Sequence, residues 1–387
     1  MKGDNAFVLN YLKQNAYRSS NFAALTVRSA VAEDDEALTQ LFTEVVHTPL
    51  MSVKLGRNSY LKTAALNYTR SDTKVIVSSA DHTQIVAMFN IGWKYCFINE
   101  KSDVQRYLAD IRTDPQADID EILAVIIEYL EEYLTDDMLF QSVLLKNQSL
   151  YQANFYQRKK GLPYAYPYDD IYCYALTDVE TPEHLHHYKI QPFKSDLITD
   201  IHDFFKLMSK HYNFLPQYNF AGLLQHQHPF WQNLDFKDFY VVYQHKQIVG
   251  FYGLWDQRHL KTMQVTAYCR GLKYFRPIYN LYMALLGKMR LPEQGQALDC
   301  LMLHSVLCHP QHLDVFSTIL HHASQQTHRK RVAAFCLALA SNDPRLTKIE
   351  ENSTYKVAAK HIFHSFHLHP KQVFDRQKIS FFELARL

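Results

Sequence analysis

His304 has a residue type and a position in the sequence that are suited to chemistry. It stands in the run LMLHSVLCHP, whose apolar residues are typical of a buried strand. The pKa of an imidazole lies near neutral pH, so a histidine that faces a substrate can accept a proton during a reaction. A histidine inside a sheet can equally be buried and satisfied by hydrogen bonds. We predict a general base here, with the buried histidine as the alternative.

Two charged residues interrupt a second strand-like segment. DIRTDP carries Asp110 and Arg112, which alternation along a strand puts on one face. A carboxylate beside a guanidinium can act as a base next to an anion clamp. The same two residues can form an ordinary ion pair. The spacing leaves both interpretations of this substrate-binding candidate open.

A third cluster follows an apolar strand that ends in Trp255. The segment WDQRHLK gathers side chains that can bind an anionic or amide-bearing substrate where a strand opens onto a cleft; they are Asp256, Gln257, Arg258 and Lys261. The alternative is a polar loop at the surface with one half-buried tryptophan.

The elements that must position these residues follow one order twice. In the first half a strand from Leu25 precedes a helix whose apolar residues keep helical spacing through Leu38, Leu41, Phe42, Val45 and Val46. A hairpin of KVIVSSA and QIVAMFNIG follows. A strand ending in DIRTDP, the helix DIDEILAVIIEYLEEYL and the strand LFQSVLLKN complete the unit.

The second half repeats this order. HYKIQPF is the first strand, DLITDIHDFFKLMSKHY the helix and DFYVVYQHKQIVGFYGLWD the hairpin. LDCLMLHSVLCHP, LDVFSTILHHASQQTHRKR and VAAFCLALASND then supply strand, helix and strand. We expect an N-terminal extension at 1–22, domains at 23–178 and 188–387, and a linker at 179–187.

An insertion at 258–297 separates the second hairpin from the next strand. Its apolar residues are spaced as on one helical face, which predicts an amphipathic helix whose stripe joins the core; they are Phe275, Ile278, Tyr279, Tyr282, Met283, Leu286 and Met289. A helix that lines a channel for a long acyl chain, or acts as a lid, is the alternative.

Composition limits the class of protein. The 387 residues suffice for two domains, and 47% hydrophobic with 21% charged residues is typical of a globular chain. The six cysteines form no CxxC pair, so we expect buried thiols and neither a disulfide framework nor a metal site. A net charge of +2 argues against nucleic acid as the main partner. Without a long apolar run or a signal-peptide core, we expect no membrane span and a cytoplasmic location.

The repeated order resembles that of the GNAT (Gcn5-related) N-acetyltransferases. DIRTDP sits as the fourth strand, and NQSLYQANFYQRKKGLPYAYP is similar to the family's exit from the fifth strand. The second half, with WDQRHLK, FRPIYNLYMALLG and LPEQG, resembles uncharacterised bacterial proteins with tandem GNAT domains. The resemblance implies an α/β fold of two tandem GNAT-like domains, each with a mixed central sheet flanked by helices.

The resemblance also implies ligands. The fourth and fifth strands would part for the pantetheine arm of acetyl-CoA or another acyl-CoA, and the next helix start would hold its pyrophosphate. Tyr156 would then return a proton to the leaving thiolate, and a packing or surface role is the alternative for this tyrosine. Contacts to the donor would come from the ends of the fifth strands and from the second loop, at Asn147, Asn342, Gln311, His312 and Leu313. For the two asparagines the alternative is that each caps the following turn.

The loops before the two long helices differ in charge. PQADIDE has no glycine and puts Asp118, Asp120 and Glu121 at the helix start, which suits a helix cap and repels a pyrophosphate. PQHLD carries one acid and two nearby histidines. We therefore expect the reacting site in the C-terminal half, with His304 as base, Asp256 and Arg258 on the substrate, and Asn342 beside the pantetheine arm.

The sequence thus predicts an N-acyltransferase that moves an acyl group from acyl-CoA or an acyl carrier to an amine, without a metal. Two alternatives stay open. One is a non-catalytic GNAT-fold binding module whose cofactor loops have degenerated, as the missing glycines suggest. The other is an aminoacyl transferase of the Fem type, against which the balanced charge argues.

Overall fold

We analysed a computed structural model of the chain. It describes residues 17–18, 24–47, 50–134, 139–145, 163–225, 229–285, 290–350, 355–366 and 373–387. The predicted Asn147 and Tyr156, and most of the N-terminal extension, lie outside these ranges.

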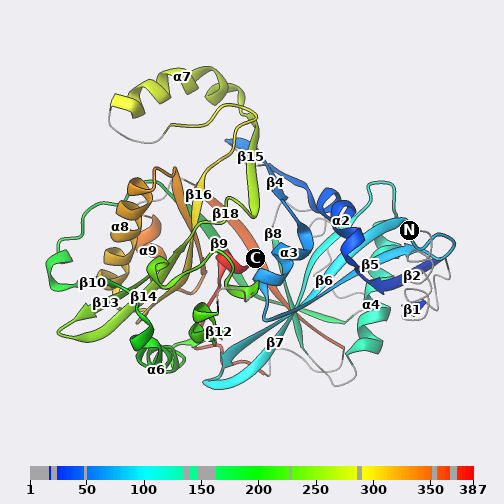
Figure 1. Ribbon diagram of the computed structural model, residues 1–387, viewed down its shortest axis with the longest axis horizontal. Coiled ribbons are helices and arrows are strands. Elements are labelled where there is room, and N and C mark those ends of the chain that lie inside the picture. Colours follow the sequence, from blue (N-terminus) through cyan, green and yellow to red (C-terminus); the bar gives the residue numbers. More distant parts are fainter. Residues whose placement is uncertain are drawn as a thin grey trace.

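One 14-stranded sheet runs through the molecule, with the strand order β1-β2-β5-β6-β7-β8-β18-β9-β17-β16-β14-β13-β10, and β12 paired to β6. Figure 1 shows the sheet passing from the first half on the right to the second half on the left. The α/β class and a mixed central sheet with flanking helices are confirmed, but the two halves share one large sheet instead of having one each. The domain boundaries stay a prediction.

The first half forms the predicted elements. Hydrogen-bonded antiparallel pairing joins β2, β5, β6 and β7, and the amphipathic helices pack on both faces of the sheet. The bounds are β1 (Tyr17–Arg18), β2 (Leu25–Ser29), α2 (Asp35–Phe42), α3 (Tyr60–Asn67), β5 (Arg70–Ser78), β6 (Ile85–Ile98), β7 (Lys101–Thr113), α4 (Ile119–Tyr133), β8 (Phe140–Leu145) and β9 (Tyr164–Leu176).

The second half repeats the pattern around two apolar clusters, one under α6 and one under α8. Its elements are β10 (Lys189–Pro192), α6 (Ile198–Met208), β11 (Tyr212–Asn213), β12 (Leu215–Pro216), β13 (Phe239–Gln244), β14 (Gln247–Trp255), β16 (Cys300–Cys308), α8 (Leu313–Arg329), β17 (Ala334–Ala340), α9 (Leu346–Glu350), β18 (Tyr355–Ser365) and β19 (Ile379–Ser380).

Each half gives its last long strand to the other. β18 lies between β8 and β9, paired antiparallel with both. β9 in turn pairs with β17 of the second half. After β18 the chain returns through β19 and ends at residue 387 between the halves, where Figure 1 marks the C-terminus. The sequence order alone predicted two separate sheets and not this exchange.

An arm made of a three-stranded sheet and one helix extends from the body, and two predictions about its residues are wrong. The first helix ends at Phe42, and Val45 and Val46 lie instead in β3 (Glu44–His47). β3 pairs with β4 (Met51–Arg57), and β4 pairs with β15 (Lys261–Tyr268) from the insertion. The helix that follows, α7 (Arg270–Leu285), contains no buried residue, so its apolar stripe does not join the core.

The thiols and helices answer two further expectations. All six cysteines are free, but Cys269 is exposed and Cys173 and Cys336 are half-buried, so only three are buried as predicted. Within the described ranges no helix has the length and apolar character that crossing a membrane requires.

At one position in the first half, a tyrosine ring packs so close to the backbone that only glycine fits without a shift of the ring. A Cβ on Gly92 of β6 would lie 2.3 Å from Cδ1 of the buried Tyr68 ring. We expect Gly92→Ala to lower the free energy of unfolding by about 1–3 kcal/mol, because the ring has to move inside a packed core. Urea denaturation measures this value.

The matched control is Gly271→Ala at the start of α7, where nothing lies within 4 Å of the added carbon. It should leave stability unchanged or raise it by up to about 1 kcal/mol. An equal effect of both substitutions would contradict the packing argument.

Candidate active site

Equivalent strands of the two halves carry the same distortion. β7 pairs in parallel with β8 only through Arg106 and Tyr107, and β16 with β17 only from Cys300 to Met302. Three residues past each last pair, Asp110 and Ser305 both have φ of 55°. A positive φ is uncommon outside glycine, and at a bulge it re-aims the backbone. In each half the two parallel strands therefore separate after their last paired residues, and a bulge lies where they part. We call this opening between the strands the splay.

The splay of the second half is filled by the chain itself. Glu383 accepts a hydrogen bond of 2.6 Å from the backbone N–H of Ser305 at the bulge. Further along, the fully buried Arg345 donates to the carbonyl oxygen of Val306 at 3.2 Å and forms a forked ion pair with Asp343. The cavity that remains between β16, β17 and residues 380–384 has about 10 Å³, which is about the space of one water molecule.

His304 lies beside this bulge with both ring nitrogens engaged. Nε2 accepts from Nε of Arg386 at 3.0 Å, and Nδ1 lies 2.6 Å from the hydroxyl of Ser305. The rings of Tyr218 and Trp255 are among those that pack against it. Complete burial, and then the charges of Arg386 and Lys94, hold the pKa of His304 well below its usual value. His304 is thus buried and hydrogen-bonded in this arrangement, and its role as a base stays a prediction.

The other donor-binding candidates of the second half lie at its surface. Gln311, His312 and Leu313 form the start of α8, and His312 is the N-cap without a side-chain cap hydrogen bond. Asn342 is exposed, and its amide lies 3.4 Å from the carbonyl oxygen of Lys378. These residues occupy the predicted positions, and their role toward a donor stays a prediction.

The WDQRHLK segment divides between the surface and the interior. Asp256 and Arg258 pair with each other at 2.7 Å, partly exposed. Gln257 is buried and donates to the carbonyl oxygen of Ala385 at 2.7 Å. Lys261 turns the other way, into the first half, where its amine contacts Asn67 and the backbone oxygen of Leu387. Of these four described residues, Lys261 lies close enough to Asp110, a candidate of the first half, for its charge to lower the pKa of that carboxyl.

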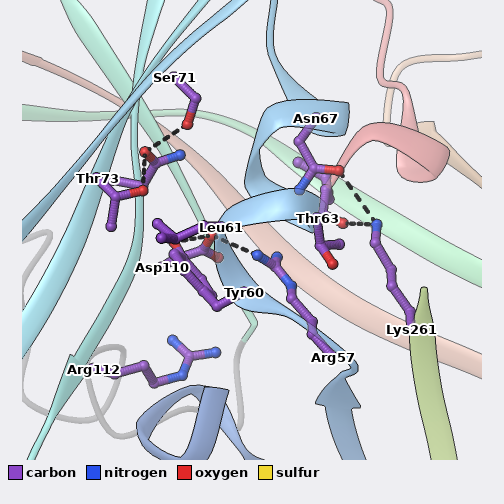
Figure 2. A network of polar contacts seen from close by, with 12 residues as sticks. Arg57, Tyr60, Leu61, Thr63, Asn67, Ser71, Thr73, Asp110, Arg112 and Lys261 are labelled. Carbon is purple, nitrogen blue, oxygen red and sulfur yellow. Dashed lines mark hydrogen bonds and ion pairs between the residues drawn. The ribbon is translucent and has the colours of Figure 1, made fainter. Parts of the chain in front are cut away.

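A polar network surrounds the bulge of the first half. Figure 2 shows Asp110 between Tyr60 and Arg57, with Lys261 approaching from β15. The carboxylate accepts from the Tyr60 hydroxyl at 2.9 Å and pairs with Arg57 at 3.3 Å. Arg112 pairs with Glu44 at 2.8 Å, so the Asp110–Arg112 ion pair, one of the two interpretations of the sequence, is replaced by two other pairs.

Asp110 stays ionised despite its burial. Burial raises the pKa of Asp110 more than any other single cause, but Arg57, Arg112 and the Tyr60 hydroxyl together hold the net value below the ordinary one. Lys261 shows the opposite pattern. Burial, and then the like charge of Arg57, lower the pKa of its amine well below the usual value.

A small cavity between the halves holds ionisable groups that the sequence reasoning missed. Lys94, Tyr107, Glu383 and Leu387 are among the residues that line it, and its volume is again about 10 Å³. Burial lowers the pKa of Lys94 to about 7 and raises that of Glu383 to about 7. Lys94 donates to the carbonyl oxygen of Arg386 at 3.0 Å and lies over the ring of Tyr107. A lysine inside the apolar strand IGWKYCFI was the signal that could have revealed it.

The start of α4 is closed by its own side chain. The carboxylate of Asp118 accepts from the backbone N–H groups of Asp120 and Glu121, so the predicted cap is confirmed. Among the described residues, no cluster of His, Cys, Asp and Glu has the composition to hold a metal ion.

Comparisons with solved structures identify the fold. Similar architectures include yeast (Saccharomyces cerevisiae) N-myristoyltransferase with bound myristoyl-CoA and inhibitors (TM-score 0.53, 9% identity, 92% of this chain and 85% of that one). A GCN5-related N-acetyltransferase from Sphaerobacter thermophilus matches with a TM-score of 0.54, 11% identity, and 90% and 97% coverage. The chain has a GNAT fold.

A third similar structure belongs to a longer protein. It is the GCN5-related glucosamine N-acetyltransferase region in a fungal multi-domain GH3 β-N-acetylglucosaminidase (TM-score 0.54, 11% identity). The match covers 88% of this chain but only 38% of that one. No family model and no curated protein matches the sequence.

The Asp343–Arg345 pair gives a test of the filled splay. Arg345→Met should lower the free energy of unfolding by about 3–5 kcal/mol, because it leaves the carboxylate of Asp343 buried and unpaired. The double variant Asp343→Leu/Arg345→Met should recover most of this loss. Arg258→Met, which breaks an exposed pair, is the control and should cost less than about 1 kcal/mol. Chemical denaturation of the wild type and these three variants measures the losses. Equal losses of unfolding free energy in Arg345→Met and Arg258→Met would refute the argument.

The buried Glu383 should make the free energy of unfolding depend on pH. The pKa is raised from 4.5 to about 7 in the folded protein, so its contribution to stability is complete below pH 4.5 and is lost as the pH rises through 7. Glu383→Gln keeps an oxygen for the N–H of Ser305 and removes this dependence. The difference in unfolding free energy between wild type and variant should change over that interval by at most about 1.4 kcal/mol per pH unit. Urea titrations at several pH values measure it, and parallel curves would rule the buried acid out.

Proposed function

We propose that this protein transfers an acyl group from a thioester to an amine, at the bulge of β7 in the first half. The contrast between the two equivalent bulges carries the proposal. At Ser305 the backbone donor is taken by Glu383, and Arg345 fills the adjoining splay. At Asp110 the chain instead presents an ordered, ionised carboxylate held by Tyr60 and Arg57, and the charge of Lys261 from the second half helps to lower its pKa. The GNAT fold, shared with acyltransferases, supports this class of reaction.

The first half supplies groups for the amine. Asp110 carries a negative charge that attracts the ammonium form of an acceptor, and Tyr60 and Arg57 fix its orientation. An amine attacks only after losing a proton. Glu383 and Lys94 have pKa values of about 7 in the cavity between the halves, which suits groups that take up and release that proton near neutral pH.

The donor is an acyl thioester, either acyl-CoA, from acetyl-CoA to longer chains, or an acyl carrier. The α4 start is an unfavourable place for the pyrophosphate of CoA, since Asp118 engages its N–H groups and adds negative charge. An acyl carrier brings one phosphate and no pyrophosphate. Comparing both donors with the same amines therefore tests the donor class directly.

A non-catalytic binding module is the second candidate. The specific observation in its favour is that Asp118 closes the start of α4 while Arg345 closes the splay of the second half. A GNAT fold without a phosphate site and with one splay filled can still hold a small molecule at the bulge of β7.

The experiment measures thiol release from acetyl-CoA, longer acyl-CoAs and an acyl carrier thioester, each with a panel of primary amines. Asp110→Asn should lower kcat/KM by about 100-fold or more, because the acceptor loses its anionic partner. Asp256→Asn, in the exposed pair with Arg258, is the matched control and should leave kcat/KM unchanged.

Thiol release from none of the donors would overturn the enzyme proposal. Calorimetric heat on adding a donor or an amine, without turnover, would then establish the binding module. Loss of activity in the Asp256 variant and not in the Asp110 variant would move the reacting site back to the second half.

A further inference from the structure

The helix α7 exposes a continuous apolar stripe. Six large side chains follow helical spacing along one face, and each is between 57% and 79% exposed; they are Tyr274, Phe275, Ile278, Leu281, Tyr282 and Leu285. Soluble surfaces expose such residues singly, so a row of six on one face indicates a surface that something covers.

The helix is held with this stripe turned away from its own anchor. Asn280 exchanges two hydrogen bonds, of 2.9 and 2.8 Å, with the backbone of Leu291. Arg276 donates to the carbonyl oxygen of Pro292 at 3.1 Å. These contacts tie the opposite side of α7 to the returning chain. Figure 1 shows α7 standing clear of the body at the end of the β15–β4 arm.

The charges of the helix have one sign. Arg270, Lys273 and Arg276 lie in α7, and residues 270–285 include no acid. Arg270 and Lys273 are exposed in the first turn, where the helix dipole adds positive potential. Two of the six stripe residues are tyrosines, a side chain enriched where a bilayer meets water. Apolar and aromatic residues on one face, with cations beside them, are typical of helices that lie in a membrane interface.

We propose that α7 docks the protein on an anionic lipid surface, with the stripe inserted among the headgroups and Arg270 and Lys273 on lipid phosphates. A second copy of the chain fits this surface less well. One helix of 16 residues, about 24 Å long, offers far fewer side chains than the roughly 20–30 residues per partner of a stable interface. Like charges on both copies would also repel. This proposal does not depend on the acyl transfer.

The test is co-sedimentation of the full chain with phosphatidylcholine vesicles, with and without about 30% phosphatidylserine. We expect binding to the anionic vesicles that weakens as salt is added. Ile278→Glu/Leu281→Glu should lower the partition coefficient at least about tenfold. Arg270→Gln/Lys273→Gln should lower binding to anionic vesicles by about fivefold per charge removed.

Leu207→Glu on α6 is the matched control, because Leu207 is also half-exposed and lies on the body. It should bind as the wild type does, and thermal melts should be alike for all variants since the changed residues are not buried. Equal binding to neutral and anionic vesicles, or unchanged binding of the Ile278/Leu281 variant, would overturn the proposal. A dimer in sedimentation velocity that this variant dissociates, without vesicle binding, would assign the stripe to a second copy instead.

Discussion

The exchange of strands between the halves is the constraint on which the rest of the structure depends. β18 pairs with β8 on one side and β9 on the other, and β9 pairs with β18 and β17. Neither half therefore has a complete sheet of its own. The exchange brings the chain after β18 back to the seam, where residues 381–387 contact the first half.

This seam explains why so many ionisable groups are buried. Lys94 and Tyr107 come from the first half, Glu383 and Arg386 from the returning chain, and Lys261 from the arm. Burying a charge costs free energy unless a partner compensates, and here cations and anions from separate elements meet in one place. Burial lowers the pKa of Lys94 to about 7 and raises the pKa of Glu383 to about 7, so the seam holds two groups that titrate near neutral pH.

Local pattern predicted the elements well and the site only in part. Alternation and helical spacing depend on neighbouring residues, so the hairpins, α4, α8 and the tandem order could be read directly. The contacts of Asp110 could not, because Arg57 and Tyr60 lie about 50 residues away in segments without a periodic signal. For α7 the pattern gave the helix and the stripe but not what faces the stripe, since periodicity does not distinguish a core from an exposed surface. Glu383 and Arg345 fill the splay between β16 and β17, and no motif in the sequence predicts that they do so.

The position of β18 in the sequence also determines when the sheet of the first half can be completed during synthesis. Residues 24–145 leave the ribosome long before residues 355–365, so β8 waits with an open edge until more than 200 further residues have been made. An open strand edge is a template for wrong pairing. Newly made chains of this protein should thus depend on chaperones late, at the closing of the shared sheet, and a truncation before β18 should aggregate instead of yielding a folded N-terminal half.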